Sequence, residues 1–168
     1  VLNKAILQPD NILNHLRTSI IESLSQSDKD GENKDGMDIS FIAYDNVKKL
    51  LHFAAANNPA LIRRGDELIE LQPDKMPISI FRDIRFPFTL NTVEIQEGDI
   101  LYMFTDGYID QFGGRKGKKF KTTNFKKLLL RIPDGDIHHQ KDLLVEHFFR
   151  WKGHLDQVDD VLLIGVRF

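Results

Sequence analysis

The sequence contains no cysteine, so no disulfide bond can stabilise the fold and no thiol can serve as a nucleophile or a metal ligand. It also lacks any apolar run near the ~20 residues that a transmembrane helix needs, and its N-terminal residues lack the layout of a signal peptide. Neither sign of charge is in large excess, because 23 basic and 25 acidic residues give a net charge of −2. We expect a soluble, cytoplasmic protein with no general attraction to nucleic acid or anionic membranes.

The chain has the length of one ordinary domain, with 168 residues of which 41% are hydrophobic. It begins at Val1 without a methionine and ends on Val166-Arg167-Phe168, the end of an apolar run. We therefore expect residues 1–168 to form a single domain that was cut from something longer at its N-terminal side.

The first element with a clear pattern is a helix over residues 10–26. Asp10 follows a proline and is a plausible N-cap, and apolar residues recur at spacings of three and four. These apolar residues are Leu13, Leu16, Ile20 and Leu24. Burying four such side chains is worth roughly 6–12 kcal/mol, so this stripe needs a partner surface.

Strands dominate the middle of the chain, and helices lie near both ends. We expect strands over residues 37–45, 50–56, 60–64, 68–71, 88–95, 100–104 and 161–168, and further helices over 123–131 and 136–151. The strands 50–56 and 60–64 look like consecutive strands of a meander, and the continuous apolarity of 100–104 indicates a central strand. Segregated strands and helices predict an α+β fold with a mostly antiparallel sheet.

Two segments have some features of metal sites but lack essential ones. The polar stretch 27–36 does not supply both the glycine and the glutamate of a calcium-binding EF-hand loop, so we interpret it as a solvated loop. His138, Asp142 and Glu146 recur every four residues on the last helix and could hold zinc. Because no cysteine and no clear second histidine completes such a site, we expect no zinc there.

A basic segment follows the stretch around residue 106. Its cationic residues are Arg115, Lys116, Lys118, Lys119 and Lys121, with Phe120 among them. Such a patch could follow a phosphate backbone. Because the run is compact, glycine-rich and part of a net acidic protein, we interpret it as a solvated loop and expect no nucleic acid partner.

Acidic residues flank two of the expected strands. Asp106 stands where the strand 100–104 ends, and Asp159 with Asp160 stands just before the final strand. If these strands are antiparallel neighbours, the carboxylates meet at the same end of the sheet. Unit charges ~4–5 Å apart repel by roughly 3–4 kcal/mol at an effective dielectric constant of about 20, so a cation or a shared proton must compensate. Aspartates at strand ends are also common as turn residues, which leaves a purely structural role open.

Carboxylate oxygens without cysteine or histidine select hard cations, which here means Mg²⁺ or Mn²⁺. Such an ion, especially with a second one beside it, can lower the pKa of a bound water and orient a phosphate ester for in-line attack. The spacing therefore offers Asp106 and Asp159 as candidate metal ligands in a site suited to phosphate ester hydrolysis.

Several short motifs occur in an order typical of one family. They are Gly36-Met37-Asp38, the turn 54–59, Lys75-Met76-Pro77-Ile78, Gly98-Asp99, Thr105-Asp106-Gly107-Tyr108, Asp110-Gln111-Phe112-Gly113-Gly114, Trp151-Lys152-Gly153 and Gln157-Val158-Asp159-Asp160. Each is weak alone. Their ordered combination spans nearly the whole chain and resembles the SpoIIE-like bacterial branch of the type 2C metal-dependent serine/threonine protein phosphatases.

The resemblance implies an antiparallel β-sandwich flanked by helices that hydrolyses phosphoserine or phosphothreonine with two Mn²⁺ or Mg²⁺ ions. Carried over by motif, Asp106 and Asp159 would bind the same ion, with Asp160 and Gly107 in the shell that supports them. Asp38 resembles an acidic residue of the family that is not a ligand, so we treat it as structural.

Two aspartate motifs of the family have no counterpart in this sequence. One lies in a glycine-aspartate strand turn, and the other lies in an aspartate-x-x-glycine-histidine-glycine segment that bridges both ions. They would precede Val1, as would several core strands and the first helix. We therefore expect residues 1–168 to be the C-terminal part of the phosphatase domain. Leu162 replaces the threonine that relatives usually carry there, a change with little bearing on metal binding.

Two hypotheses follow. In the first, the chain belongs to a working phosphatase that has an N-terminal sensor or receiver region, which could attach it to a membrane, and that acts on a phosphorylated regulator such as an anti-sigma-factor antagonist. In the second, it is a non-catalytic module that binds a signalling partner or assembles complexes. We expect these residues alone to be inactive and, because half a sandwich exposes apolar faces and strand edges, to form homo-oligomers.

Overall fold

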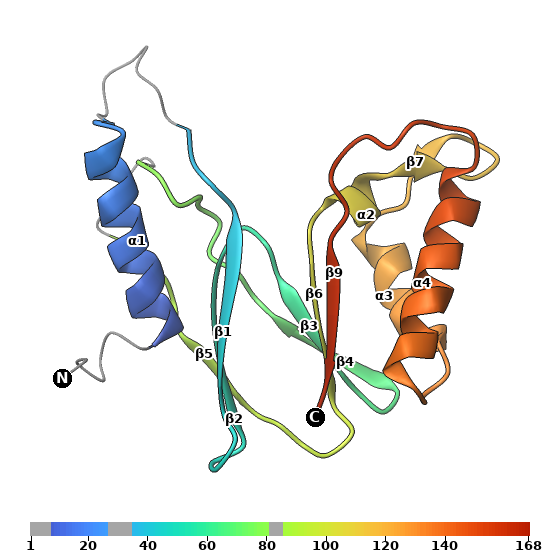
Figure 1. Ribbon diagram of the computed structural model, residues 1–168, viewed down its shortest axis with the longest axis horizontal. Helices are drawn as coiled ribbons and strands as arrows, with labels where there is room; N and C mark the ends of the chain where they lie inside the picture. The colour runs from blue at the N-terminus through green and yellow to red at the C-terminus, as the bar shows by residue number, and fades with distance from the viewer. Residues whose placement is uncertain (1–7, 27–34, 81–85) are drawn as a thin grey trace. The chain divides into compact units, whose positions relative to one another are not determined.

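The computed structural model describes residues 8–26, 35–80 and 86–168 (Figure 1). The helices are α1 (Pro9–Ser23), α2 (Gly107–Asp110), α3 (Thr122–Arg131) and α4 (Ile137–Lys152). The strands are β1 (Ile39–Asp45), β2 (Leu50–Ala56), β3 (Ala60–Arg64), β4 (Glu67–Leu71), β5 (Asn91–Glu94), β6 (Ile100–Phe104), β7 (Phe112–Gly113), β8 (Lys118–Lys119) and β9 (Leu163–Arg167). The chain divides into two compact units, Val1–Pro59 with Leu71–Ile95 and Ala60–Glu70 with Gln96–Phe168.

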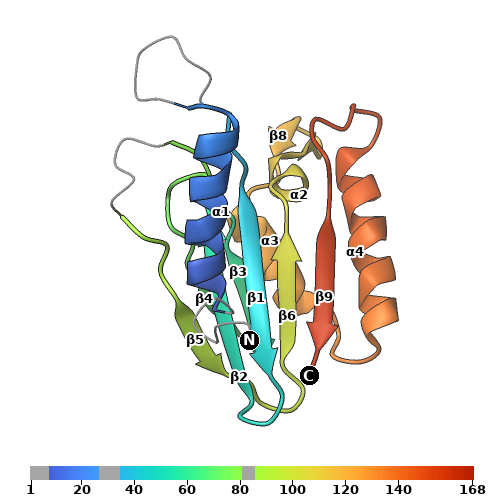
Figure 2. The same ribbon diagram turned by 60° about the vertical axis from the view of Figure 1, so that its left-hand side comes forward.

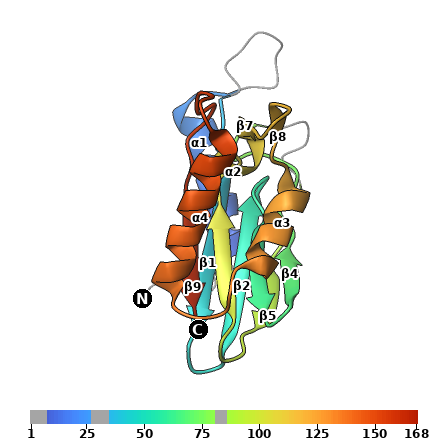
Figure 3. The ribbon, with the colours of Figure 1, turned by 90° about the vertical axis from the view of Figure 1, so that its right-hand side faces the viewer.

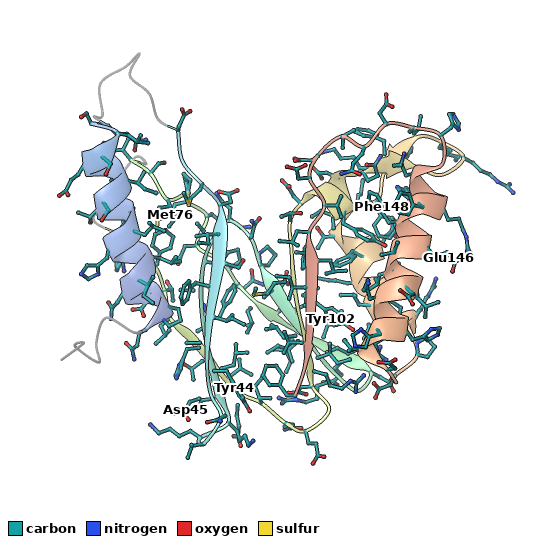
Figure 4. All side chains as sticks on the ribbon, viewed as in Figure 1. Tyr44, Asp45, Met76, Tyr102, Glu146 and Phe148 are labelled. Atoms are coloured by element: carbon teal, nitrogen blue, oxygen red, sulfur yellow. The ribbon has the colours of Figure 1, made fainter. Side chains whose placement is uncertain are left out.

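The first unit contains a three-stranded antiparallel sheet in the order β1-β2-β5, with α1 packed against β1 and β2 (Figure 2). Its core consists of apolar side chains from α1, β2 and the segments that follow: Leu13, Ala54, Ala56, Met76, Ile78 and Phe88. Met76 lies between α1 and the strands (Figure 4). The apolar stripe of the first helix thus finds the partner surface that its sequence requires.

Helix α1 starts differently from the sequence prediction. Pro9 takes one of its first positions, where a missing N–H is tolerated, and Gln8 is the N-cap without a side-chain hydrogen bond. The prediction of Asp10 as the N-cap is therefore wrong. Asp10 lies in the first turn, where its charge still interacts favourably with the helix dipole.

The apolar stripe of α1 is confirmed over three of its four residues. Leu13 is fully buried, and Leu16 and Ile20 pack against the same core. Leu24 is 50% exposed because the helix ends at Ser23, and Leu24 forms its C-cap.

The second unit contains a four-stranded sheet in the order β4-β3-β6-β9, in which β3 and β9 both run antiparallel to β6. Helices α3 and α4 lie along one face of this sheet (Figure 3). Their core is aromatic and aliphatic: Leu61, Ile100, Tyr102, Phe104, Tyr108, Phe120, Phe125, Leu129, Ile132, Leu144 and Phe148. Figure 4 shows Tyr102 and Phe148 between the sheet and α4, and Glu146 on the outer side of α4. The prediction of residues 100–104 as a central strand is confirmed, because β6 has a neighbour on each side.

The expected meander of residues 50–56 and 60–64 is wrong, because β2 and β3 belong to different sheets. The chain leaves the first sheet at Asn57, which has a φ of 60° and whose amide donates to the carbonyl of Asp74 at 2.9 Å. The amide of Asp74 donates in turn to Ala55 at 3.0 Å. This pairing with a later segment directs the chain away from β2, and Ala60 begins the pairing of β3 with β6.

Most other element boundaries agree with the sequence pattern to within a few residues. Asp136 caps α4, where its side chain accepts a hydrogen bond from the amide of His138 at 3.0 Å. Strands β5 and β9 are shorter than predicted, and α2, β7 and β8 were not predicted. Most of the polar stretch 27–36 lies outside the described residues, so its interpretation as a solvated loop stays a prediction.

Antiparallel sheets with flanking helices confirm the α+β prediction. Among the described residues, no helix combines the length and the apolarity that crossing a bilayer requires.

Candidate metal-binding site

Strands β6 and β9 are antiparallel neighbours, with Phe104 opposite Leu163 where β6 ends. The pairing continues beyond the strands: the amide of Thr105 donates to the carbonyl of Leu162 at 3.0 Å, and the amide of Leu162 donates to the Thr105 hydroxyl at 2.9 Å. The same hydroxyl donates to the carbonyl of Asp160 at 2.8 Å. The segment that precedes β9 is therefore held against the end of β6, as the predicted convergence of carboxylates requires.

Gly107, the first residue of α2, packs against the same segment. A Cβ built on Gly107 would lie 2.4 Å from the carbonyl oxygen of Asp160 and 2.9 Å from its carbonyl carbon. Only glycine lets the backbone turn from β6 into α2 at this distance. Because Asp106 lies between Thr105 and Gly107, its backbone is held beside that of Asp160.

The side chains of Asp106, Asp159 and Asp160 are exposed. The backbone of Asp106 is fixed by its carbonyl, which accepts a hydrogen bond from the amide of Asp110 at 2.8 Å. The amide of Asp160 donates to Oδ1 of Asp159 at 2.7 Å, and Nε2 of Gln157 donates to the carbonyl of Asp159 at 2.8 Å. Acidic side chains are thus presented to solvent at one end of the sheet, from backbone that hydrogen bonds hold in place.

These carboxylates have the chemistry that suits a hard divalent cation, which prefers oxygen ligands. Within residues 8–26, 35–80 and 86–168, however, no group of three or more histidine, aspartate or glutamate side chains is arranged to hold a metal ion. Asp106 and Asp159 therefore fit part of a coordination shell. Water or further protein ligands would have to complete it.

Two further acidic residues of the family motifs, Asp38 and Asp110, bind to other parts of the protein. Asp38 accepts a hydrogen bond from Nδ2 of Asn57 at 2.8 Å, which ties the start of β1 to the turn after β2 and agrees with a structural role. Asp110 forms an ion pair with Lys119, with 2.7 Å between the Lys119 Nζ and the carboxylate.

Tyr108 anchors α2 in the core of the second unit. Its hydroxyl donates to the carbonyl of Leu144 at 2.9 Å, and its ring centroid lies 5.1 Å from that of Phe148. Burial raises the pKa of Tyr108, so this phenol stays protonated and serves as a structural donor. Burial, followed by the charge of Arg150, lowers the pKa of the neighbouring His147.

Thr105 and Gln111 position the acidic segments, and no pattern in the sequence predicts this role for either residue. Gln111 is fully buried, and its Nε2 donates to the carbonyl of Asp156 at 2.8 Å and to that of Phe112 at 3.0 Å. Its Oε1 accepts from the amide of Val158 at 3.4 Å. A polar residue in a glycine-rich, polar stretch carries no periodic signal of burial, so its role could be found only from the fold.

The sequence model of the family described as Stage II sporulation protein E (SpoIIE) matches residues 2–168. The chain belongs to the SpoIIE family. Stage II sporulation protein E of Bacillus subtilis (strain 168) is 28% identical over 112 residues, which are 66% of this chain and 13% of that protein. The SpoIIE-family chain therefore corresponds to a small part of this curated relative.

Two solved structures show the fold that this SpoIIE-family chain shares. The SiaA-PP2C domain of Pseudomonas aeruginosa matches with a TM-score of 0.83 and 24% identity, over 96% of this chain and 61% of that one. The manganese-presoaked phosphatase domain of SpoIIE from Bacillus subtilis matches with a TM-score of 0.61 and 20% identity, over 94% of this chain and 73% of that one. The fold of a type 2C phosphatase domain, predicted from the sequence motifs, is confirmed.

Proposed function

We propose that the chain carries part of the active site of a metal-dependent serine/threonine protein phosphatase. The observation that carries this proposal is the Thr105 hydroxyl, which bonds both the carbonyl of Asp160 and the amide of Leu162. These bonds place Asp106 and the Asp159-Asp160 pair at one end of β6. Membership of the SpoIIE family and the fold of type 2C phosphatase domains support the reaction class.

Asp106 and Asp159 would hold an Mn²⁺ or Mg²⁺ ion, with Asp160 and Gly107 fixing the backbone around them; a complete domain would hold two ions. A bound ion of this kind neutralises charge on the phosphoryl group and supplies a water of lowered pKa. The role of this chain is to position the ligands. The two paired strand ends hold the backbone that carries the carboxylates, which limits the reorganisation needed when a phosphorylated side chain enters. The relative presoaked with manganese supports the choice of metal.

These 168 residues by themselves are expected to bind divalent ions weakly and to turn over a phosphopeptide negligibly. The sequence has no aspartate-x-x-glycine-histidine-glycine segment, and the described residues contain no group of three candidate ligands. Robust manganese-dependent hydrolysis by the 168 residues alone would contradict this expectation.

The incomplete ligand set also favours a second candidate, a non-catalytic phosphatase-like module that binds a signalling partner. The two candidates differ in what the carboxylates do. In a phosphatase, Asp106 and Asp159 are needed for turnover, whereas in a binding module their neutralisation leaves partner binding unchanged.

The test uses the natural protein with all the segments that it carries, assayed on a phosphoserine peptide with Mn²⁺ and with EDTA. Asp106→Asn and Asp159→Asn are each expected to lower kcat/KM by roughly 100-fold or more, since losing even an outer-shell partner of a metal ligand costs 10–100-fold. Asp66→Asn, which removes the same charge from the exposed turn before β4, is expected to stay within about twofold. Equal activity of the three variants, or activity that survives EDTA, would reject the phosphatase.

We also propose the partners that the family resemblance suggests: a phosphorylated regulatory protein, such as an anti-sigma-factor antagonist, and an N-terminal sensor or receiver region of the same protein. A second copy of the chain is a further proposed partner. Within the described residues β9 is the last strand of its sheet, and Ile164 and Val166 on it are 40% and 37% exposed. An edge of this kind can pair with an identical strand. A strictly monomeric light-scattering profile at high concentration would reject this pairing.

A further inference from the structure

The hairpin of β7 and β8 carries the densest positive charge of the described chain. Its cationic side chains are all exposed: Arg115, Lys116, Lys118, Lys119 and Lys121. The whole protein has a net charge of −2, so this positive charge is local rather than general. A local charge of this kind attracts anionic groups at short range, because the Debye length is about 8 Å at physiological ionic strength.

The hairpin is fixed to the end of α4. The amide of Gly114 donates to the carbonyl of Trp151 at 2.9 Å, and Nε1 of Trp151 donates to the carbonyl of Gln111 at 3.0 Å. A Cβ on Gly113 would lie 2.0 Å from that same Trp151 carbonyl oxygen. The hairpin and the end of α4 are therefore in close backbone contact, and the cationic side chains project from a backbone with a defined position.

The hairpin is also bonded to the segment that carries Asp106. The amide of Lys121 donates to the carbonyl of Ile109 at 2.7 Å, and Lys119 pairs with Asp110 at 2.7 Å. Asp110 lies one helical turn beyond Asp106 and bonds its carbonyl. Figures 1 and 3 both show β7 beside α2. The cations thus stand next to the candidate metal-binding site.

Most of the hairpin cations are available to a ligand. Lys119 pairs with Asp110, whereas the other four, Arg115, Lys116, Lys118 and Lys121, form no ion pair within the described part of the chain. The ring of Phe112, 39% exposed, lies 6.0 Å from the Lys119 Nζ and adds an apolar contact to the same surface.

We propose that this basic hairpin is the docking surface for an acidic segment next to the phosphorylated residue of a protein substrate. The inference rests on the proposed phosphatase function, since the substrate's phosphate would lie at Asp106 and Asp159. A phosphorylated side chain carries a charge of about −1.5 to −2, and flanking carboxylates would pair with Lys116 and Lys118. A short acidic peptide segment fits this surface better than a nucleic acid, because the cations are confined to one short hairpin and do not continue along a surface that could follow a long phosphate backbone.

The test measures binding in EDTA, so that it does not depend on metal or turnover. The probes are fluorescent peptides with one phosphoserine flanked by glutamates, the same peptide with serine, a phosphoserine peptide flanked by lysines, and a single-stranded oligonucleotide. Fluorescence anisotropy is read with the wild-type chain, with Lys116→Glu/Lys118→Glu, and with the control Lys48→Glu/Lys141→Glu, which makes the same charge change at exposed sites elsewhere. Circular dichroism checks that the variants fold, and Lys116→Ala/Lys118→Ala repeats the test without charge reversal.

The proposal predicts that the two glutamate-flanked peptides bind more tightly than the lysine-flanked peptide and the oligonucleotide, and that their Kd rises at least about tenfold in Lys116→Glu/Lys118→Glu but by less than about twofold in the control. Raising the salt concentration should weaken binding to the wild type more than to this variant. The proposal would be overturned if Lys116→Glu/Lys118→Glu and the control Lys48→Glu/Lys141→Glu lost equal affinity for the peptide. It would also be overturned if the oligonucleotide bound more tightly than the glutamate-flanked peptides. Peptide binding at the hairpin in a protein without phosphatase activity would reject the proposed function but keep the docking surface, so the two inferences can be told apart.

Discussion

The hydroxyl of Thr105 donates a hydrogen bond to the main-chain carbonyl of Asp160 at 2.8 Å. This bond joins the residue before Asp106 to the residue after Asp159. The bonded residues are 55 positions apart in the sequence, and this one side chain links the two acidic segments. The pairing of β6 with β9, and the hydrogen bonds that continue it beyond the strand ends, therefore bring the two acidic segments together.

Replacing Thr105 by valine tests the hydrogen bonds of its hydroxyl group, because valine keeps the shape of the side chain and removes the hydroxyl. The carbonyl of Asp160 and the amide of Leu162 each lose a partner at an exposed position, so the free energy of unfolding should fall by about 0.5–1.5 kcal/mol. Thr105→Ser keeps the hydroxyl, so its free energy of unfolding should fall by less than that of the valine variant. Urea unfolding of both variants measures the difference, and a valine variant as stable as the serine variant would contradict the role of the hydroxyl.

Gly107→Ala tests the close approach of α2 to the segment before β9. The added methyl would lie 2.4 Å from the carbonyl oxygen of Asp160, so the backbone must shift and stability should fall by about 1–3 kcal/mol. Gly135→Ala is the matched control, because a Cβ there meets nothing within 4 Å. Equal melting temperatures for the two variants would show that the contact has no consequence.

Gln111→Leu tests the buried amide that holds the segment leading to Asp159. The carbonyl of Asp156 loses a donor and the amide of Val158 loses its acceptor, so hydrogen exchange at Val158 should become faster. Gln72→Leu, at an exposed position in the first unit, is the control. Unchanged exchange at Val158 would mean that other contacts hold this segment.

The fold was more predictable from the sequence than the site. Residues 50–56, 60–64 and 100–104 match β2, β3 and β6 because their apolar runs and turn residues carry a local signal. The assignment of β2 and β3 to different sheets depends on the pairing of Asn57 with Asp74, which is not local and gives no periodic pattern. The roles of Asp106 and Asp159 as metal ligands come from motif resemblance and stay a prediction, whereas Thr105 and Gln111 act through contacts that only the tertiary structure defines.

Asp99 gives a prediction for the dependence of stability on pH. Burial raises its pKa, but hydrogen bonds from the Arg64 guanidinium and the Gln96 amide, together with the charge of Arg64, outweigh burial and hold the pKa below its usual value. A carboxylate with a lowered pKa stabilises the fold above its unfolded-state pKa of about 3.9, and that stability is lost as the pH falls through the folded-state pKa.

Asp99→Asn should therefore lower the free energy of unfolding by about 1–3 kcal/mol at pH 7 and flatten its fall below about pH 4. Asp66→Asn, at an exposed position, should leave the wild-type profile unchanged. Urea unfolding between pH 7 and pH 2.5 measures both profiles. If the free energy of unfolding of Asp99→Asn still fell steeply below about pH 4, carboxylates other than Asp99 would be responsible for the acid sensitivity.

The central claim is that the side chains of Asp106 and Asp159 share one cation, and paramagnetic broadening by Mn²⁺ tests it most directly because it detects weak binding without turnover. Small amounts of Mn²⁺ are added to the ¹⁵N-labelled chain while the amide signals are followed. The account predicts that the signals of Asp106, Gly107, Asp159 and Asp160 broaden together, and that either Asp106→Asn or Asp159→Asn removes the broadening from all four. Broadening at only one of the two segments, or broadening that survives in either variant, would contradict it.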